Sequence, residues 1–141
     1  MTNLTYERCV ACRKDSPHVT ETEIAELKPQ IPAWNIVEHR QIPRLERTFR
    51  FKNFVQALDF ANKVGALAEA EGHHPAILTE YGRTTVYWWT HAIKGLHRND
   101  FIMAAKTDQI ATQFADQGKA KPTPTSPPFG MFQFDQSQLD S

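Results

Sequence analysis

The feature of this sequence that most constrains its fold is a long amphipathic segment at residues 53–71. Apolar side chains recur there at three- and four-residue spacing, which predicts a helix that buries one face. The predicted stripe consists of Phe54, Leu58, Ala61, Val64 and Ala68, widened by Ala57 and Leu67. Asn53 is a suitable N-cap, and Gly72 followed by Pro75 predicts that the helix ends there.

Two pairs of β-type segments flank this helix along the chain. Residues 33–38 and 44–51 form the first pair, and residues 75–81 and 83–91 form the second around Gly82. The last of these segments is especially rich in β-branched and aromatic residues. Paired segments separated by short turns predict two antiparallel hairpins.

Two further helices are predicted outside the hairpins. Thr20 with Glu23 three residues later forms a capping box, which predicts the start of a short helix. A last helix is expected over residues 98–117, with Asp100 in its first turn, where a negative charge suits the helix dipole. The order of elements predicts an α+β, two-layer domain with an antiparallel four-stranded sheet and helices packed on one face.

The last predicted strand carries a tryptophan on each face. Side chains alternate along a strand, so Trp88 and Trp89 point to opposite sides of the sheet. One face is therefore expected to contact the helices, and the other to be partly covered by a ligand or a second subunit.

The domain is expected to span residues 20–117. Residues 1–19 are polar and lack periodicity, which predicts a flexible N-terminal lead. Residues 118–141 contain a Pro-rich stretch with Lys, Thr and Ser, which predicts an extended, mobile tail.

Composition restricts the class of protein. Lys plus Arg and Asp plus Glu are equal at 16 each, so the formal net charge is zero and direct binding to nucleic acid is not expected. No apolar run approaches the roughly 18 residues that span a bilayer, and residues 1–17 lack the apolar core of a secretory signal. A cytoplasmic location is expected, with Cys9 and Cys12 as reduced thiols.

Three histidines are the strongest candidates for chemistry. His73 and His74 follow the long helix, and His91 ends the last strand, so the three could meet at one rim of the sheet. Imidazole titrates near neutrality and acts as acid or base. Asp100 or Glu69 could orient one of the rings or hold a substrate N–H.

Other interpretations of these residues stay open at this point. A Gly-His-His-Pro run is also an effective helix terminator, and His91 could be an ordinary strand-end residue. Three histidines and a carboxylate could hold a metal, but adjacent histidines usually point apart and no metal-binding spacing is present. The pair Cys9 and Cys12 has no second pair to complete a zinc site, so a metal is not expected there either.

Taken together, these residues resemble the signature of the pterin-4a-carbinolamine dehydratases, over about residues 20–117. The early Cys-x-Ala-Cys and the stretch 88–100 resemble the bacterial branch associated with phenylalanine hydroxylase. One departure is His97, where the family often has Ser or Thr capping the last helix. The resemblance rests on Gly72-His73-His74-Pro75, Thr90-His91, Gly95-Leu96 and Asp100.

The resemblance implies a function and a site. Members convert 4a-hydroxytetrahydropterin, such as 4a-hydroxytetrahydrobiopterin, to quinonoid dihydropterin and water, which recycles the pterin of aromatic amino acid hydroxylases. They need no metal or bound cofactor and form homodimers or homotetramers, and coupling to phenylalanine hydroxylase is implied here. The implied catalytic residues are His73, His74 and His91, and the implied substrate-binding residues are Glu69, Pro75, Thr90 and Asp100.

A mechanism follows as a hypothesis. Loss of the hydroxyl as water requires an acid at that oxygen and a base for a ring N–H proton. We expect His74 and His91 to exchange these roles while His73 binds and polarises the hydroxyl. Two alternatives are a dimeric binding module that regulates a transcription factor or hydroxylase, and a small metal-dependent hydrolase.

Overall fold

The computed structural model describes residues 3–11 and 13–119. The chain forms two units, Met1–Ala111 and Thr112–Ser141. The first unit holds the sheet and the candidate site, and the end of the last helix is all that is described of the second. No helix in the described part of the chain is both long and apolar enough to cross a bilayer.

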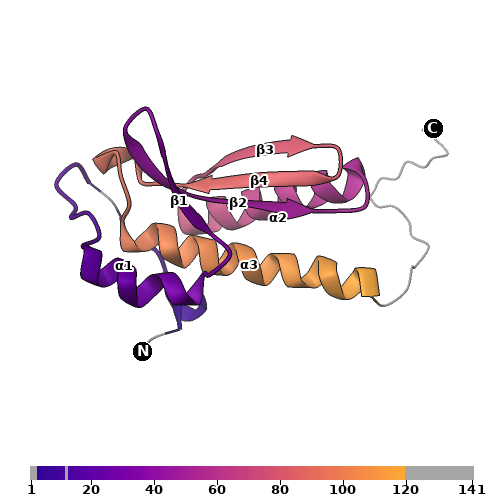
Figure 1. Cartoon of the computed structure of the whole chain (residues 1–141), viewed down its shortest axis with the longest axis horizontal. Coiled ribbons are helices and arrows are strands. Elements are labelled where there is room, and N and C mark those ends of the chain that lie inside the picture. The colour runs from indigo at the N-terminus through magenta and orange to yellow at the C-terminus, as the bar shows by residue number, and fades with distance from the viewer. Residues whose placement is uncertain (1–2, 12, 120–141) are drawn as a thin grey trace. The chain divides into compact units, whose positions relative to one another are not determined.

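The elements follow the predicted order (Figure 1). Short 3-10 turns η1, η2 and η3 accompany three helices and four strands in the described residues. They are η1 (Leu4–Tyr6), α1 (Glu21–Leu27), η2 (Lys28–Gln30), β1 (Asn35–His39), β2 (Ile42–Arg50), α2 (Phe54–Glu71), β3 (Ala76–Glu80), β4 (Arg83–Trp88), η3 (His91–Ile93) and α3 (Arg98–Lys119).

The four strands form one antiparallel sheet in the order β1-β2-β4-β3. Both long helices pack on the same face of it. The hydroxyl of Thr84 on β4 donates to the carbonyl of Ala57 on α2, and Arg47 on β2 forms an ion pair with Asp108 on α3. The predicted α+β, two-layer fold is confirmed.

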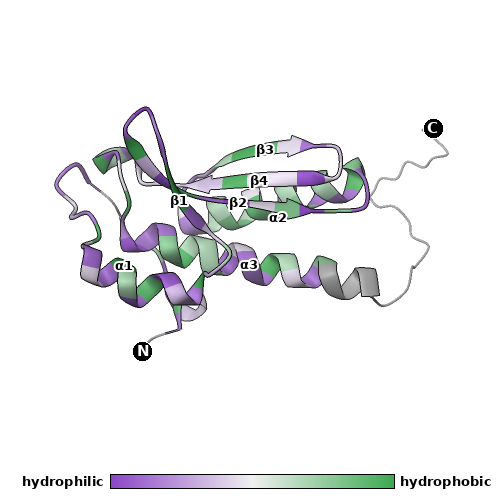
Figure 2. Cartoon of the chain, in the orientation of Figure 1, coloured by the Kyte–Doolittle hydropathy of each residue, from purple (hydrophilic) through white to green (hydrophobic). Residues whose placement is uncertain are grey.

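Both hairpins close through two-residue turns. Arg40 and Gln41 link β1 to β2 with φ of 53° and 69°, the left-handed pair that suits the right-handed strand twist. This turn is hydrophilic in Figure 2. Tyr81 and Gly82 link β3 to β4, and Gly82 takes φ of 76°, which favours a residue without a Cβ.

Helix α2 begins and ends as predicted, but its buried stripe is shifted. Asn53 caps the helix through the backbone N–H of Gln56, and Gly72 ends it in the left-handed conformation. Phe54 and Leu58, which the pattern placed on the buried face, are about half exposed. The sheet instead covers the face centred on Ala57, Phe60, Val64 and Ala68.

Aromatic packing fills the space between the layers. The ring of Phe49 lies 4.6 Å from that of Phe60 and 5.9 Å from that of Trp34, measured between centroids. Trp34 donates its indole N–H to Asp108, which also accepts from Arg47. Burial raises the pKa of Asp108, although both of these donors oppose that effect.

The N-terminal residues contact the rest of the first unit. Leu4 is fully buried, and its N–H donates to the side chain of Gln30. Thr20 and Glu23 form the predicted capping box at the start of α1. The predicted tail lies outside the described residues from 120 onward, as does Cys12, and the proposed domain boundaries stay predictions.

Candidate active site

His73 is positioned by the end of α2. The backbone N–H groups of Gly72 and His73 both donate to the carbonyl of Ala68, which turns the chain sharply at the helix terminus. This turn brings Nε2 of His73 to 2.7 Å from Oδ1 of Asp100 on α3. A carboxylate oxygen accepts hydrogen bonds, so this contact assigns a proton to Nε2 of His73.

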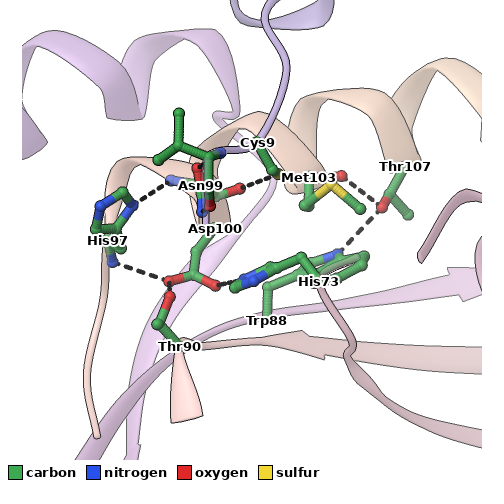
Figure 3. Close-up of polar contacts among 10 residues, drawn as sticks. Cys9, His73, Trp88, Thr90, His97, Asn99, Asp100, Met103 and Thr107 are labelled. Carbon is green, nitrogen blue, oxygen red and sulfur yellow. Dashed lines mark hydrogen bonds and ion pairs between the residues drawn. The ribbon is translucent and has the colours of Figure 1, made fainter. Parts of the chain in front are cut away.

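Asp100 is fully buried and holds three groups at once (Figure 3). Its Oδ2 accepts from the hydroxyl of Thr90 at 2.8 Å and from the backbone N–H of His97 at 2.9 Å. Since all three partners donate, the carboxylate is fixed in one orientation.

His97 caps α3 through its side chain and its backbone. Its Nδ1 accepts the backbone N–H of Asn99 at 3.0 Å, while Asp100 accepts the backbone N–H of His97. This arrangement differs from a capping box in that the side chain of His97 binds the second helical residue and not the third. Burial lowers the pKa of His97, despite the nearby Asp100 carboxylate. A lowered pKa favours the neutral imidazole, whose unprotonated Nδ1 can accept the hydrogen bond of the cap.

The ring of His73 is stacked on Trp88. The two planes are 8° from parallel, with centroids 5.8 Å apart. Trp88 is held by its indole N–H, which donates to the hydroxyl of Thr107, and that hydroxyl donates to the carbonyl of Met103 (Figure 3). Residues from β4 and α3 thus fix the plane of the His73 ring.

His74 lies in a different environment. Its Nε2 is 2.6 Å from Oε2 of Glu69, one turn earlier in the chain. The two side chains are 58% and 77% exposed, so this ring can contact water and a ligand. Two adjacent histidines therefore each have a carboxylate partner, one buried and one exposed.

The position of His91 differs from the prediction. It was expected at the end of a strand, but β4 ends at Trp88 and His91 begins η3. Thr90 pairs with Gly95 across this tight loop, which turns the chain away from the sheet. The ring of His91 stacks on Trp89 at 4.5 Å between centroids, and the guanidinium of Arg44 lies 3.8 Å above the same indole.

His73, His74 and His91 all line one pocket of about 360 Å³. Four predicted site residues line it, and Glu69 and Asp100 hold two of the lining histidines from outside. Pro75 follows His74 but is not among the lining residues. The pocket is lined by Val10, Gly72, His73, His74, Thr90, His91 and Ala92.

One lining residue and two supporting residues of this site were not predicted from the sequence. Val10 lines the pocket from a segment far away in the chain, and no local pattern indicated that contact. Asn99 and Thr107 support the site from α3. Their positions one residue before and seven residues after Asp100 place them on the same helix, which is the only signal the sequence offered.

The described residues contain no group of three or more His, Cys, Asp and Glu side chains arranged to hold a metal ion. His73 and His74 point to separate carboxylates, which is consistent with adjacent histidines pointing apart. The alternative of a metal-dependent hydrolase therefore has no ligand set within residues 3–11 and 13–119.

Fold and site define a class: a small α+β domain whose pocket presents several imidazoles backed by carboxylates, suited to acid–base chemistry on a small molecule. The sequence model of the family "Pterin 4 alpha carbinolamine dehydratase" matches residues 17–110. This chain belongs to the pterin-4a-carbinolamine dehydratase family. The predictions of the family and of a dehydratase, a carbon–oxygen lyase, are confirmed at this level.

Individual relatives agree with this result. A protein of Nitrosococcus oceani named as a pterin-4-alpha-carbinolamine dehydratase is 63% identical over 110 residues, 78% of this chain and 97% of that protein. One of Gloeobacter violaceus with the same activity in its name is 66% identical over 111 residues, 79% of this chain and 96% of that protein. A crystal structure of a transcriptional coactivator/pterin dehydratase from Brucella melitensis is 33% identical with a TM-score of 0.61, covering 67% of this chain and 99% of that one.

Proposed function

We propose that this chain dehydrates 4a-hydroxytetrahydropterins to quinonoid dihydropterins by histidine acid–base catalysis. The observation that carries the proposal is the pocket in which His73, His74 and His91 meet, each ring held by a separate partner. Family membership supplies the substrate class, and the described geometry is suited to the two proton transfers.

The reaction needs one proton donor and one proton acceptor. The C4a–O bond breaks with its electron pair, and an acid protonates the leaving hydroxyl so that it departs as water. The lone pair of N5 forms a double bond to C4a, and a base removes the proton from N5. An imidazolium and a neutral imidazole meet both needs near neutral pH, and each contributes typically about 10²–10⁴-fold.

His74 and His91 are proposed as the acid and the base. Both rings are accessible from the pocket and from water, so protons can be exchanged with solvent after each turnover. One imidazole loses a proton and the other gains one in each reaction, so the pair can exchange roles between turnovers.

His73 is proposed to bind and polarise the hydroxyl and not to act as the acid or the base. Its ring is buried between Trp88 and Asp100, and its Nε2–H is already engaged. Glu69, Thr90 and Asp100 complete the proposed substrate site through the histidines they hold or flank, and a contact of Pro75 with substrate stays a prediction.

The experiment is to follow the decay of enzymatically generated 4a-hydroxytetrahydropterin by ultraviolet absorbance, with and without the protein. Catalytic amounts of wild type should accelerate the decay. His73→Ala should mainly raise KM, whereas His74→Ala and His91→Ala should mainly lower kcat. A decay rate that is independent of the protein concentration would refute the proposal.

The homodimer or homotetramer and the coupling to phenylalanine hydroxylase belong to the same proposal. Exposed apolar side chains on one face of α2, Phe54, Val55 and Leu58, support self-association. Light scattering measures the oligomer directly. A phenylalanine hydroxylase assay with pterin recycling should run faster when this protein is added, and the cytoplasmic location stays a prediction.

A second candidate is a binding module with a regulatory role. The similar protein from Brucella melitensis is named as a transcriptional coactivator as well as a pterin dehydratase. The zero net charge argues against direct contact with nucleic acid, so such a role requires a protein partner. A protein that fails to accelerate dehydration but still self-associates would favour this candidate.

A further inference from the structure

The short segment formed by residues 7–10, called the N-terminal wall below, is fixed to the domain by three separate contacts. Glu7 accepts two hydrogen bonds from Arg98, at 2.7 and 2.8 Å. The N–H of Cys9 donates to Glu71, whose other oxygen accepts from Lys106. Such redundancy holds a segment without regular secondary structure in one path.

The third contact lies beside the catalytic pocket. The N–H of Val10 donates to Oδ1 of Asn99 at 3.1 Å, and Nδ2 of Asn99 donates back to the carbonyl of Val10 at 2.7 Å. Asn99 precedes Asp100, and Glu71 precedes Gly72, so the wall is attached next to two residues that form the site. The N-terminal wall is therefore held by the residues that directly precede Gly72 and Asp100 of the site.

Val10 is one of the residues that line the pocket. Its backbone is bonded on both sides to Asn99, yet the residue is 61% exposed and lines the cavity. Most of the other lining side chains are imidazoles or small and polar. Val10 and Ala92 supply the apolar part of the lining.

The family model begins at residue 17, so the wall lies outside the segment that defines the family. Building on the proposed function, we propose that Val10 determines specificity by contacting the C6 substituent of the bound pterin. In the pterin ring C6 is bonded to N5, the atom that loses a proton. An apolar group next to the histidines is therefore within reach of the substituent on C6 and complements its hydrocarbon portion.

Substitutions at Val10 test this directly, because an exposed side chain contributes little to folding. Val10→Ala removes two methyl groups and should raise KM for a substrate with a dihydroxypropyl group at C6 by about fivefold. Val10→Trp should raise that KM by about tenfold or more while changing the KM of a 6-methyl substrate much less. The value of kcat should stay within about twofold of wild type for both, because the wall moves no proton.

A second test loosens the wall from a distance. Glu7→Gln removes the ion pair with Arg98 and should accelerate amide hydrogen exchange at Cys9 and Val10. Glu80→Gln removes a similar bidentate pair with Arg83 at the β3–β4 turn and is the matched control. In wild type, saturation with 7,8-dihydrobiopterin, which lacks the 4a-hydroxyl, should slow exchange at these two amides.

The outcomes separate this inference from the function on which it rests. If wild type dehydrates the pterin but both Val10 variants keep its KM with both substrates, the role of Val10 is refuted and the dehydratase is not. Unchanged exchange at Cys9 and Val10 on ligand saturation would also refute it. If wild type neither dehydrates the pterin nor binds the analogue, both proposals fail together.

Discussion

His73 and Asp100 form a buried hydrogen bond, with Nε2 of the imidazole 2.7 Å from Oδ1 of the carboxylate. His73 follows the terminus of α2 and Asp100 lies in the first turn of α3, 27 positions later in the chain. Asp100 also binds Thr90 and the backbone of His97, so one carboxylate joins two helices and the loop after β4. The geometry of the site and the stability of the fold are therefore both expected to depend on the Asp100 carboxylate.

Asp100→Asn tests this dependence. All three partners of Asp100 are donors, so the amide nitrogen must face one of them and leave it unpaired or force His73 into its other tautomer. The free energy of unfolding should fall by about 1–3 kcal/mol, measured by urea denaturation. The value of kcat/KM should fall by about 100-fold. The exposed Asp59→Asn is the control, and a variant as active and stable as wild type would contradict this role of Asp100.

Gly72 offers a test of backbone strain at the site. It has φ of 68°, and no heavy atom lies within 4 Å of the position a Cβ would take, so Gly72→Ala costs conformational energy alone. We expect a loss of about 1–2 kcal/mol, and a smaller loss for Gly72→Asn. Gly65→Ala in the middle of α2 has equal space and ordinary φ, and should stabilise by about 1 kcal/mol. Equal changes in Tm for Gly72→Ala and Gly65→Ala would contradict the left-handed conformation of Gly72.

Much of the fold could be predicted because its signals are local. The capping box at Thr20, the N-cap at Asn53 and the stop at Gly72 act within a few residues, and each lies where it was expected. The buried stripe of α2 was harder to predict, because Phe54, Leu58 and Phe60 are equally apolar. Only the position of the sheet decides that Phe60 is covered and the other two are not.

The candidate site was predicted less completely, because its contacts are distant in the chain. The spacing of His73, His91 and Asp100 indicated which residues meet, but not that Asp100 holds His73 while Glu69 holds His74. The strand pattern extended past Trp88 to His91, whereas the pairing of Thr90 with Gly95 ends it earlier. The contact of Glu7 with Arg98 could not be predicted either, because an ion pair between residues some 90 positions apart leaves no local pattern in the sequence.

Arg44 is expected to position His91 through Trp89. Its guanidinium covers one side of the indole, and the imidazole lies against the same ring system. Arg44→Met removes a cation–π contact of about 0.5–2 kcal/mol and should lower kcat/KM about threefold to tenfold by freeing Trp89. Trp89 fluorescence reports the same change. Arg47→Met removes a comparable contact over Phe49 on the helix-covered face and should lower stability without affecting kcat/KM.

The N-terminal wall should weaken in acid. Burial alone would raise the pKa of Glu71, but the hydrogen bonds from Lys106 and from the N–H of Cys9 outweigh it and lower the pKa below the ordinary 4.5. A depressed carboxyl pKa stabilises the folded state above the ordinary value and loses this contribution as the pH falls through the folded value. Wild type should exceed Glu71→Gln in unfolding free energy by about 1–3 kcal/mol at neutral pH.

The difference in unfolding free energy between wild type and Glu71→Gln should shrink as the pH falls below about 4.5. Denaturation between about pH 7 and pH 3 measures it. Asp108, whose pKa burial raises, changes in the opposite direction, but it is present in both proteins and cancels in the comparison. A difference that stays constant or grows toward low pH would contradict the ion pair of Glu71 with Lys106.

The proposed roles of His74 and His91 are tested by comparing wild type with the double variant His74→Ala/His91→Ala in one assay. Decay of 4a-hydroxytetrahydropterin is followed by ultraviolet absorbance at equal protein concentrations, with the exposed His39→Ala as control and circular dichroism to verify folding. We predict that wild type and His39→Ala accelerate the decay and that the folded double variant loses at least about 100-fold of this acceleration. Equal acceleration by the double variant, or none by wild type, would contradict the claim that these imidazoles carry out the dehydration.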